Sequence, residues 1–122
     1  MNDIKLMNKA ADNIRILAAS MVEKAKSGHP GGAMGGADFV NVLFSEFLVY
    51  DPKNPAWEGR DRYFQDPGHM SPMLYSVLAL AGKFTIDELK EFRQWGSVTP
   101  GHPEVNVMRG IENTSGPFGQ GH

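Results

Sequence analysis

The apolar residues between positions 4 and 25 recur every three or four residues, and this spacing is the strongest constraint on the fold. Such spacing places them along one face of an α-helix. Two lysines in the last turn, Gly28 as a left-handed cap and Pro30 as a block to continuation define its end. The sequence therefore predicts a long amphipathic helix over residues 4–25.

A second helix is predicted to start among the glycines between about residues 34 and 38 and to run to about residue 48. Its apolar residues point nearly all round the helix: Phe39, Val40, Val42, Leu43, Phe44, Phe47 and Leu48. A helix that is apolar on every side is normally buried. We therefore expect this segment to be covered on most sides, by more partners than one neighbouring helix.

The rest of the sequence predicts two more helices and only short extended segments. A helix over residues 71–81 ends at Gly82, and Thr85 and Glu88 have the spacing of a capping box that opens another. Residues 62–65 are predicted as a short strand, and residues 105–108 as a short extended piece. One strand without a second strand and a crossover forms no parallel sheet, so the chain is typical of the opening portion of a larger protein.

Composition narrows the classes of function. The 122 residues suffice for one modest domain, and a net charge of −2 gives no electrostatic case for nucleic acid or an anionic membrane. The absence of cysteine excludes disulfides, thiolate metal sites and a cysteine nucleophile. With no secretory signal and no apolar run of about 20 residues, we expect a cytoplasmic protein.

All four histidines follow a glycine, which composition alone does not explain. The pairs end at His29, His69, His102 and His122. Glycine leaves space for a ligand beside the backbone, and imidazole exchanges protons near neutral pH. The first three pairs lie on separate loops that could converge on one pocket, whereas we assign His122, at the terminus, no role.

Simpler interpretations of these motifs stay open. A single Gly-His pair is most often a polar turn, and a zinc site is conceivable although no pair has the short spacing common in metal sites. The stretch GHPGGAMGGAD could also bind an anion at a helix N-terminus, although it matches neither the Walker pattern nor a dinucleotide fingerprint.

Four stretches together resemble the N-terminal part of transketolases: KSGHPGGAMGGAD, RDRYFQDPGHMSPMLYS, FRQWGSVTPGHPE and ENTSGPFGQGH. They occur in the same order and spacing, and the resemblance covers about residues 9–122. It implies a thiamine-diphosphate enzyme that transfers a two-carbon ketol unit from a ketose phosphate to an aldose phosphate in the pentose phosphate pathway. The implied fold is α/β, with residues 1–122 as the N-terminal part of the cofactor's diphosphate-binding domain, mostly helical with one or two short strands.

The resemblance also implies roles for individual residues. His29 matches the histidine that approaches the substrate hydroxyls and assists proton transfer, and His102 matches the one that binds the donor's C1 hydroxyl and the reactive intermediate. His69 matches the histidine that reaches the cofactor diphosphate. The tripeptide whose backbone lies against the aminopyrimidine ring corresponds to Gly116, Pro117 and Phe118.

The sequence also departs from the family pattern. Phe118 replaces a usual leucine, and Pro67 and Met70 flank the second Gly-His pair where small or polar residues are more common. The family's Mg²⁺ segment, its activating glutamate and its phosphate-binding arginines have no counterpart here, so no metal ligand is assigned to this chain. We therefore expect these 122 residues alone to bind the cofactor weakly and to be inactive.

The partners that the resemblance implies are sugar phosphates, the remainder of a transketolase chain or a complementary subunit, and a second copy in a homodimer. One alternative is an enzyme similar to deoxyxylulose-phosphate synthase, against which TPGHPE and SGPFGQG both count. Another is a non-catalytic truncated or helical dimerisation fragment, which the apolar second helix favours.

Overall fold

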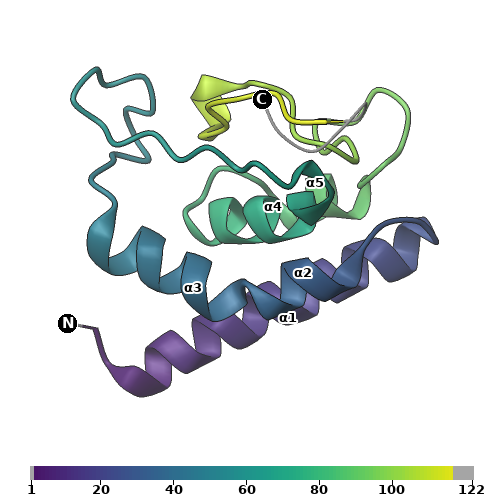
Figure 1. The fold of residues 1–122 in the computed structure, drawn as a ribbon, viewed down its shortest axis with the longest axis horizontal. Helices are drawn as coiled ribbons and strands as arrows, with labels where there is room; N and C mark the ends of the chain where they lie inside the picture. The colour runs from purple at the N-terminus through teal and green to yellow at the C-terminus, as the bar shows by residue number, and fades with distance from the viewer. Residues whose placement is uncertain (1, 117–122) are drawn as a thin grey trace.

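The computed structural model describes residues 2–116 of the chain, and helices and loops make up this whole range (Figure 1). The α-helices are α1 (Ile4–Ala25), α2 (Pro30–Gly35), α3 (Ala37–Val42), α4 (Ser71–Leu80) and α5 (Ile86–Lys90). Shorter turns are a π-helix η1 (Leu43–Phe47) and two 3₁₀-helices, η2 (Gly68–Met70) and η3 (Val107–Arg109). Helix α1 runs along one side, and α2, α3, α4 and α5 all contact it.

The amphipathic pattern of α1 is confirmed, with its cap two residues earlier than predicted. Asp3 caps the first turn by accepting a hydrogen bond from the backbone N–H of Leu6 at 3.0 Å. The left-handed residue at the end is Lys26, with φ of 52°, and not Gly28. The face predicted to be buried packs inward through Ala11, Ile14, Ala18 and Met21.

Helix α4 is the centre of the core. Every residue from Ser71 to Leu78 is buried, and α4 packs against α1, α2, α3 and α5. Each large apolar side chain buried in such a core contributes about 1.5–3 kcal/mol. The capping box predicted at Thr85 and Glu88 is also confirmed, since each side chain binds the other residue's backbone N–H.

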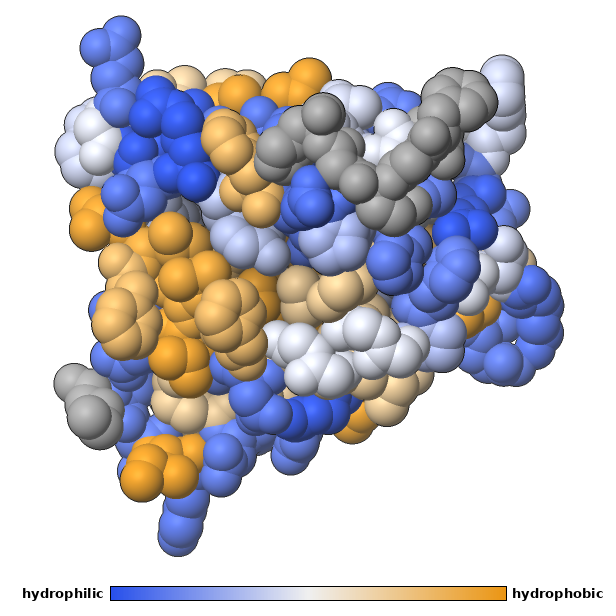
Figure 2. All heavy atoms as spheres, in the orientation of Figure 1, coloured by the Kyte–Doolittle hydropathy of each residue, from blue (hydrophilic) through white to orange (hydrophobic). Residues whose placement is uncertain are grey.

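The second predicted helix is confirmed in its bounds, because α3 and η1 together run from Ala37 to Phe47, but its predicted burial is wrong. A short helix that the sequence analysis did not predict, α2, precedes it and begins at Pro30, because proline fits the first position of a helix. Gly36 separates α2 from α3, and the segment after α3 ends in a π-turn, where Leu48 N–H donates to the Leu43 carbonyl at 2.9 Å. Phe39 and Phe47 are 66% and 69% exposed, because among the described residues only one side of this segment meets other helices. Figure 2 shows apolar side chains gathered on this side of the molecule, where Figure 1 draws the end of α3 and the segment after it.

The strand predicted over residues 62–65 is also wrong, because residues 2–116 offer it no partner strand. Its last residue, Gln65, bonds a side chain instead, with its N–H donating to Asn113 Oδ1 at 3.3 Å. The extended piece predicted over residues 105–108 is reduced to one isolated bridge between Asn106 and Ile111, followed by η3. The α/β class is therefore not confirmed within the described range.

No helix within residues 2–116 is long and apolar enough to cross a membrane.

Candidate functional site

His29 occupies the turn between α1 and α2. It is the residue before the first helical position of α2, with extended backbone at φ −126° and ψ 102°, and its side chain is exposed. The proline that follows favours this extended conformation. The imidazole of His29 meets that of His69 edge to face, with ring centroids 5.2 Å apart and planes at 71°.

His69 lies in η2, the single 3₁₀ turn that leads into α4. The glycine before it is packed too tightly to carry a side chain. A Cβ at Gly68 would lie 2.8 Å from the carbonyl oxygen of Ser115 and 2.9 Å from Cδ2 of His102. This glycine therefore lets the loops of His69, His102 and Ser115 touch.

The loop that carries His102 is fixed from the core. The hydroxyl of Ser71 donates to the Gly101 carbonyl at 2.7 Å, and the hydroxyl of Tyr75 donates to the Pro100 carbonyl at 2.6 Å. On its other side, the His102 ring packs on Gly116, where φ is +74° and a Cβ would lie 2.5 Å from Cδ2 of His102. The buried helix α4 thus sets the position of this imidazole.

Electrostatics distinguish His102 from an ordinary histidine. Burial lowers the pKa of His102 below its usual value of 6.5, and the positive charge of Arg93 lowers this pKa further, as do His29 and His69. Its imidazole is therefore held neutral at pH 7. A neutral imidazole carries one N–H donor and one acceptor, so it can both bind a hydroxyl and accept a proton.

The structure brings four of the six proposed site residues together: His29, His69, His102 and Gly116. They come from four separate segments of the chain, and their rings and backbone are in direct contact. Pro117 and Phe118, together with His122, lie outside the described residues.

The sequence matches a known protein family over nearly its whole length. The family model described as transketolase, thiamine diphosphate binding domain, matches residues 6–122. The chain belongs to the transketolase family. A transketolase of Buchnera aphidicola is 53% identical over 117 residues, which cover 95% of this chain and 18% of that protein.

Solved transketolases have the same fold over this range. The Campylobacter jejuni enzyme matches 98% of this chain and 19% of its own, with a TM-score of 0.90 and 47% identity. A Pichia stipitis transketolase in complex with sedoheptulose-7-phosphate matches 94% of this chain and 17% of its own, with a TM-score of 0.87 and 45% identity. The chain therefore spans less than a fifth of the length of these relatives.

The donors at this site fit thiamine diphosphate, the ligand that the family description implies. The three imidazoles supply N–H donors and acceptors for an anionic, polar ligand. Two residues after His29, a Cβ at Gly31 would meet nothing within 4 Å outside its own helical turn, so the backbone there is open to approach. Among the described residues, no group of three or more histidine or acidic side chains could hold a metal ion.

Sequence reasoning missed three residues that build the site. Tyr75 and Ser71 anchor the His102 loop, and Arg93 joins that loop to the turn of His29. An open groove of about 870 Å³ runs beside Arg93 and His102 and is also lined by Ser27. The stretch FRQWG that contains Arg93 supported the family resemblance, but no local pattern indicated that its arginine reaches both loops.

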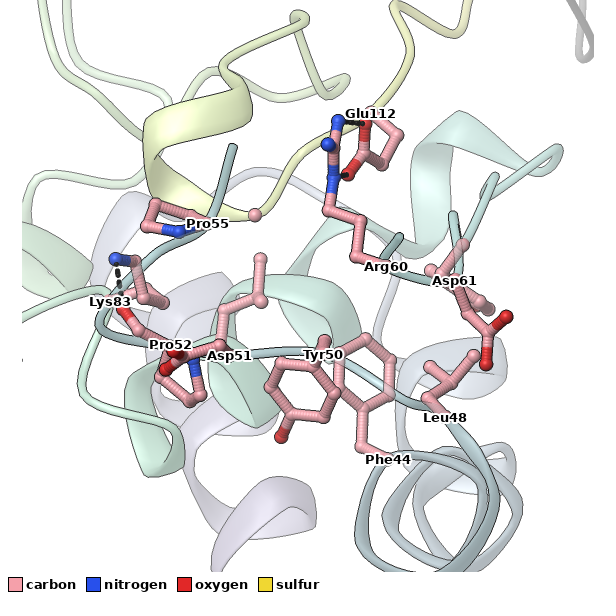
Figure 3. Close-up of a pocket in the computed structure, with 13 residues that line it drawn as sticks. Phe44, Leu48, Tyr50, Asp51, Pro52, Pro55, Arg60, Asp61, Lys83 and Glu112 are labelled. Atoms are coloured by element: carbon pink, nitrogen blue, oxygen red, sulfur yellow. Dashed lines mark hydrogen bonds and ion pairs between the residues drawn. The ribbon is translucent and has the colours of Figure 1, made fainter. Parts of the chain in front are cut away.

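A second cavity, lined in part by Phe44 and Tyr50, belongs to the packing of the fold and not to the site of the histidines (Figure 3). Its volume of about 40 Å³ accommodates one or two water molecules but not a sugar phosphate. Figure 3 shows the Arg60 guanidinium paired with the Glu112 carboxylate beside it, at 2.6 and 2.9 Å. This ion pair joins the loop after η1 to residues near 112, and none of the three histidines lines the cavity.

Proposed function

We propose that this chain forms part of the thiamine-diphosphate site of a transketolase that transfers a two-carbon ketol unit from a ketose phosphate to an aldose phosphate. One observation carries the proposal: three Gly-His loops from distant parts of the sequence meet, with His29 and His69 at 5.2 Å and His102 packed against Gly68 and Gly116. The sedoheptulose-7-phosphate complex of the Pichia stipitis relative supports sugar phosphates as substrates.

The chain's residues would divide the work between cofactor and substrate. When bound, thiamine diphosphate supplies a thiazolium that stabilises the carbanion needed to move the ketol unit. His69 would hold its diphosphate by donating an N–H. The backbone that would lie against its aminopyrimidine ring belongs to Gly116, Pro117 and Phe118.

His29 and His102 would handle the sugar. His29 is exposed at the start of α2, so it can reach substrate hydroxyls and pass a proton. His102 would bind the donor's C1 hydroxyl as a neutral imidazole, because burial and the charge of Arg93 lower its pKa. A positioned imidazole of this kind contributes about 100-fold or more to the rate of a proton transfer.

The proposal extends to several properties of the whole enzyme. The whole enzyme would use Mg²⁺ as counterion of the diphosphate, and no ligand of this metal is assigned to this chain. It would form a homodimer in the cytoplasm. The α/β sheet of its fold would come from parts of the protein beyond this segment. Residues 1–122 are assigned to the N-terminal part of the diphosphate-binding domain, to be joined by the remainder of a transketolase chain or by a complementary subunit.

A chimaera tests this function. Residues 6–116 of this chain would replace the matching segment of the Campylobacter jejuni transketolase, and ketol transfer would be assayed with added thiamine diphosphate and Mg²⁺. We expect transfer by the chimaera, and a loss of about 100-fold in kcat/KM on His102→Ala. A folded chimaera without transfer, or one indifferent to His102→Ala, would contradict the proposal.

A second candidate, association through an apolar face, is favoured by the exposure of Phe39 and Phe47. Such side chains on one surface are typical of a protein interface. Sedimentation of the 122-residue chain and of a Phe39→Ser, Phe47→Ser variant tests it: we expect assembly of the unmodified chain only, and a monomeric unmodified chain would exclude it.

A further inference from the structure

Arg93 lies between the two loops that carry His29 and His102. Its backbone is in the left-handed region, with φ of +60°, which non-glycine residues rarely adopt. In this conformation its N–H donates to the Thr99 carbonyl at 3.1 Å, which ties it to the loop that leads to His102. A rare backbone conformation of this kind costs about 1–3 kcal/mol and persists only where the surroundings hold it.

The Arg93 side chain reaches the other loop. Its Nη1 donates to Ser27 Oγ at 2.9 Å, across 66 residues of sequence. The same side chain covers Gly101, where a Cβ would lie 2.8 Å from Nε and 3.1 Å from Cζ. Gly28 faces it from the opposite loop, and a Cβ there would lie 3.7 Å from Nε.

The Arg93 side chain packs on Phe92, a residue of the buried core. Phe92 is 1% exposed, and the Arg93 guanidinium carbon lies 5.6 Å from the centroid of its ring, within range of a cation–π contact. Phe92 also approaches Gly28, since a Cβ there would lie 3.2 Å from Cε1 of its ring. Two of the three Gly-His pairs thus have their glycine against Phe92 or Arg93.

We propose that Arg93 is a positioning residue of the transketolase site, which sets the separation of His29 and His102 by joining the glycines that precede them. The inference rests on the proposed function, because it assigns Arg93 to the histidines of that site. Arg93 acts through these histidines: its Nη1 is bound to Ser27, and its Nε is buried against Gly101, without a hydrogen-bond partner among the described residues.

The charge of Arg93 has a second effect at the same place. The charged and titratable groups around His102 are Arg93, His29, His69 and, along the groove, Glu104. After burial, Arg93 is the largest influence that lowers the pKa of His102. Loss of the positive charge of Arg93 should therefore raise the pKa of His102 toward 6.5. Loss of the planar guanidinium with the charge retained should not raise it.

Three variants and one control test the inference. Arg93→Met removes the charge and the hydrogen bond, Arg93→Lys keeps the charge but lacks the planar guanidinium, and Ser27→Ala removes only the hydrogen bond. Arg109→Met is the matched control, because Arg109 also lies over a phenylalanine ring, Phe84, at 5.0 Å and pairs with Glu88, away from the histidines.

The first readout is catalysis in the Campylobacter jejuni chimaera. We expect Arg93→Met to lower kcat by about tenfold or more with a change in KM below about threefold, since it disorients groups without removing a substrate contact. Ser27→Ala should lower kcat by about two- to threefold, and Arg109→Met should leave both constants within about twofold. Unchanged kcat in a folded Arg93→Met chimaera would overturn the inference.

The second readout is the histidine NMR spectrum of the 122-residue chain, which needs no activity. We expect Arg93→Met to move the imidazole resonances of His29 and His102 and to raise the pKa of His102, while Arg93→Lys moves the resonances with the lower pKa retained. Resonances and pKa that match the Arg109→Met control would refute the role. Absence of ketol transfer in the unsubstituted chimaera would count against the proposed function, and this NMR readout would still decide the role of Arg93.

Discussion

The loop that ends at His102 and the turn that ends at His29 have similar Gly-His-Pro sequences but very different surroundings. Buried hydroxyls of Ser71 and Tyr75 bind two successive carbonyls of the first loop, and Gly68 and Gly116 press against its imidazole. The second is exposed, makes no side-chain cap to α2, and is followed by Gly31 in open space.

Glycine therefore has two different roles at this site. Around His102, glycines let segments of the protein itself approach each other, so the imidazole is fixed before any ligand arrives. Beside His29, glycine leaves the backbone open, so a ligand can approach it. Substitutions on the crowded side should therefore destabilise the fold, and substitutions on the open side should affect binding.

The largest effect is expected for Gly116→Ala. Left-handed backbone costs alanine about 1–2 kcal/mol, and the collision with the His102 ring adds about 1–3 kcal/mol. We expect urea denaturation to give a loss of about 2–5 kcal/mol, with displaced His102 resonances.

Gly82→Ala is the matched control for this substitution. Gly82 has a similar φ of +81°, but a Cβ there would meet no described atom within 4 Å. It should lose only the conformational part, about 1–2 kcal/mol. Equal losses for the two variants would show that the packing of His102 on Gly116 is unimportant.

Tyr75→Phe should have the next largest effect. It leaves the Pro100 carbonyl without its 2.6 Å donor in a buried site, which costs about 1–3 kcal/mol. Tyr50→Phe is the matched control, because the half-buried Tyr50 hydroxyl makes no hydrogen bond within residues 2–116, and we expect a change below about 0.5 kcal/mol. Similar values for both tyrosines would mean that α4 does not anchor the loop.

Gly31→Ala should increase stability on the open side. Gly31 has no positive φ, and alanine at such a position stabilises by about 0.4–1 kcal/mol because the unfolded chain has fewer conformations to lose. The added methyl group meets nothing within 4 Å outside its own helical turn. In the chimaera the same methyl group should weaken thiamine-diphosphate binding, measured by calorimetry. A gain in stability with unchanged cofactor affinity would place the ligand elsewhere.

The smallest effect is a pH dependence from His102. Its pKa is lowered in the folded state, so between that pKa and 6.5 the unfolded chain binds more protons. Stability should therefore fall as the pH drops below 6.5 and level off below the folded-state pKa. Urea denaturation from pH 7.5 to 5 measures this slope, and His102→Gln should reduce it; an identical slope in the variant would contradict the shift.

The local features of the fold could be predicted from the sequence. Helices α1 and α4 and the capping box at Thr85 depend on spacing within a few residues, which periodicity captures. The strand over residues 62–65 was wrong because strand formation depends on a partner from elsewhere. The burial expected of Phe39 and Phe47 was wrong for a related reason, since sequence pattern does not indicate which neighbours cover a side chain.

At the site, the residues that carry the chemistry could be predicted from the sequence. The residues that hold them in position could not. The Gly-His pairs and the resemblance indicated His29, His69, His102 and Gly116, which the structure brings together. Arg93 was missed because its contact with Ser27 spans 66 residues and involves ordinary residue types. The roles assigned to these residues in binding and catalysis remain predictions.

Nuclear Overhauser contacts between the histidine side chains test most directly whether the three loops share one site. In the folded 122-residue chain with labelled histidine, we predict cross-peaks between the imidazole protons of His29 and His69. We also predict cross-peaks from Hδ2 of His102 to the α-protons of Gly68, which precedes His69, and to those of Gly116. A folded chain that lacks both sets of cross-peaks would contradict the account.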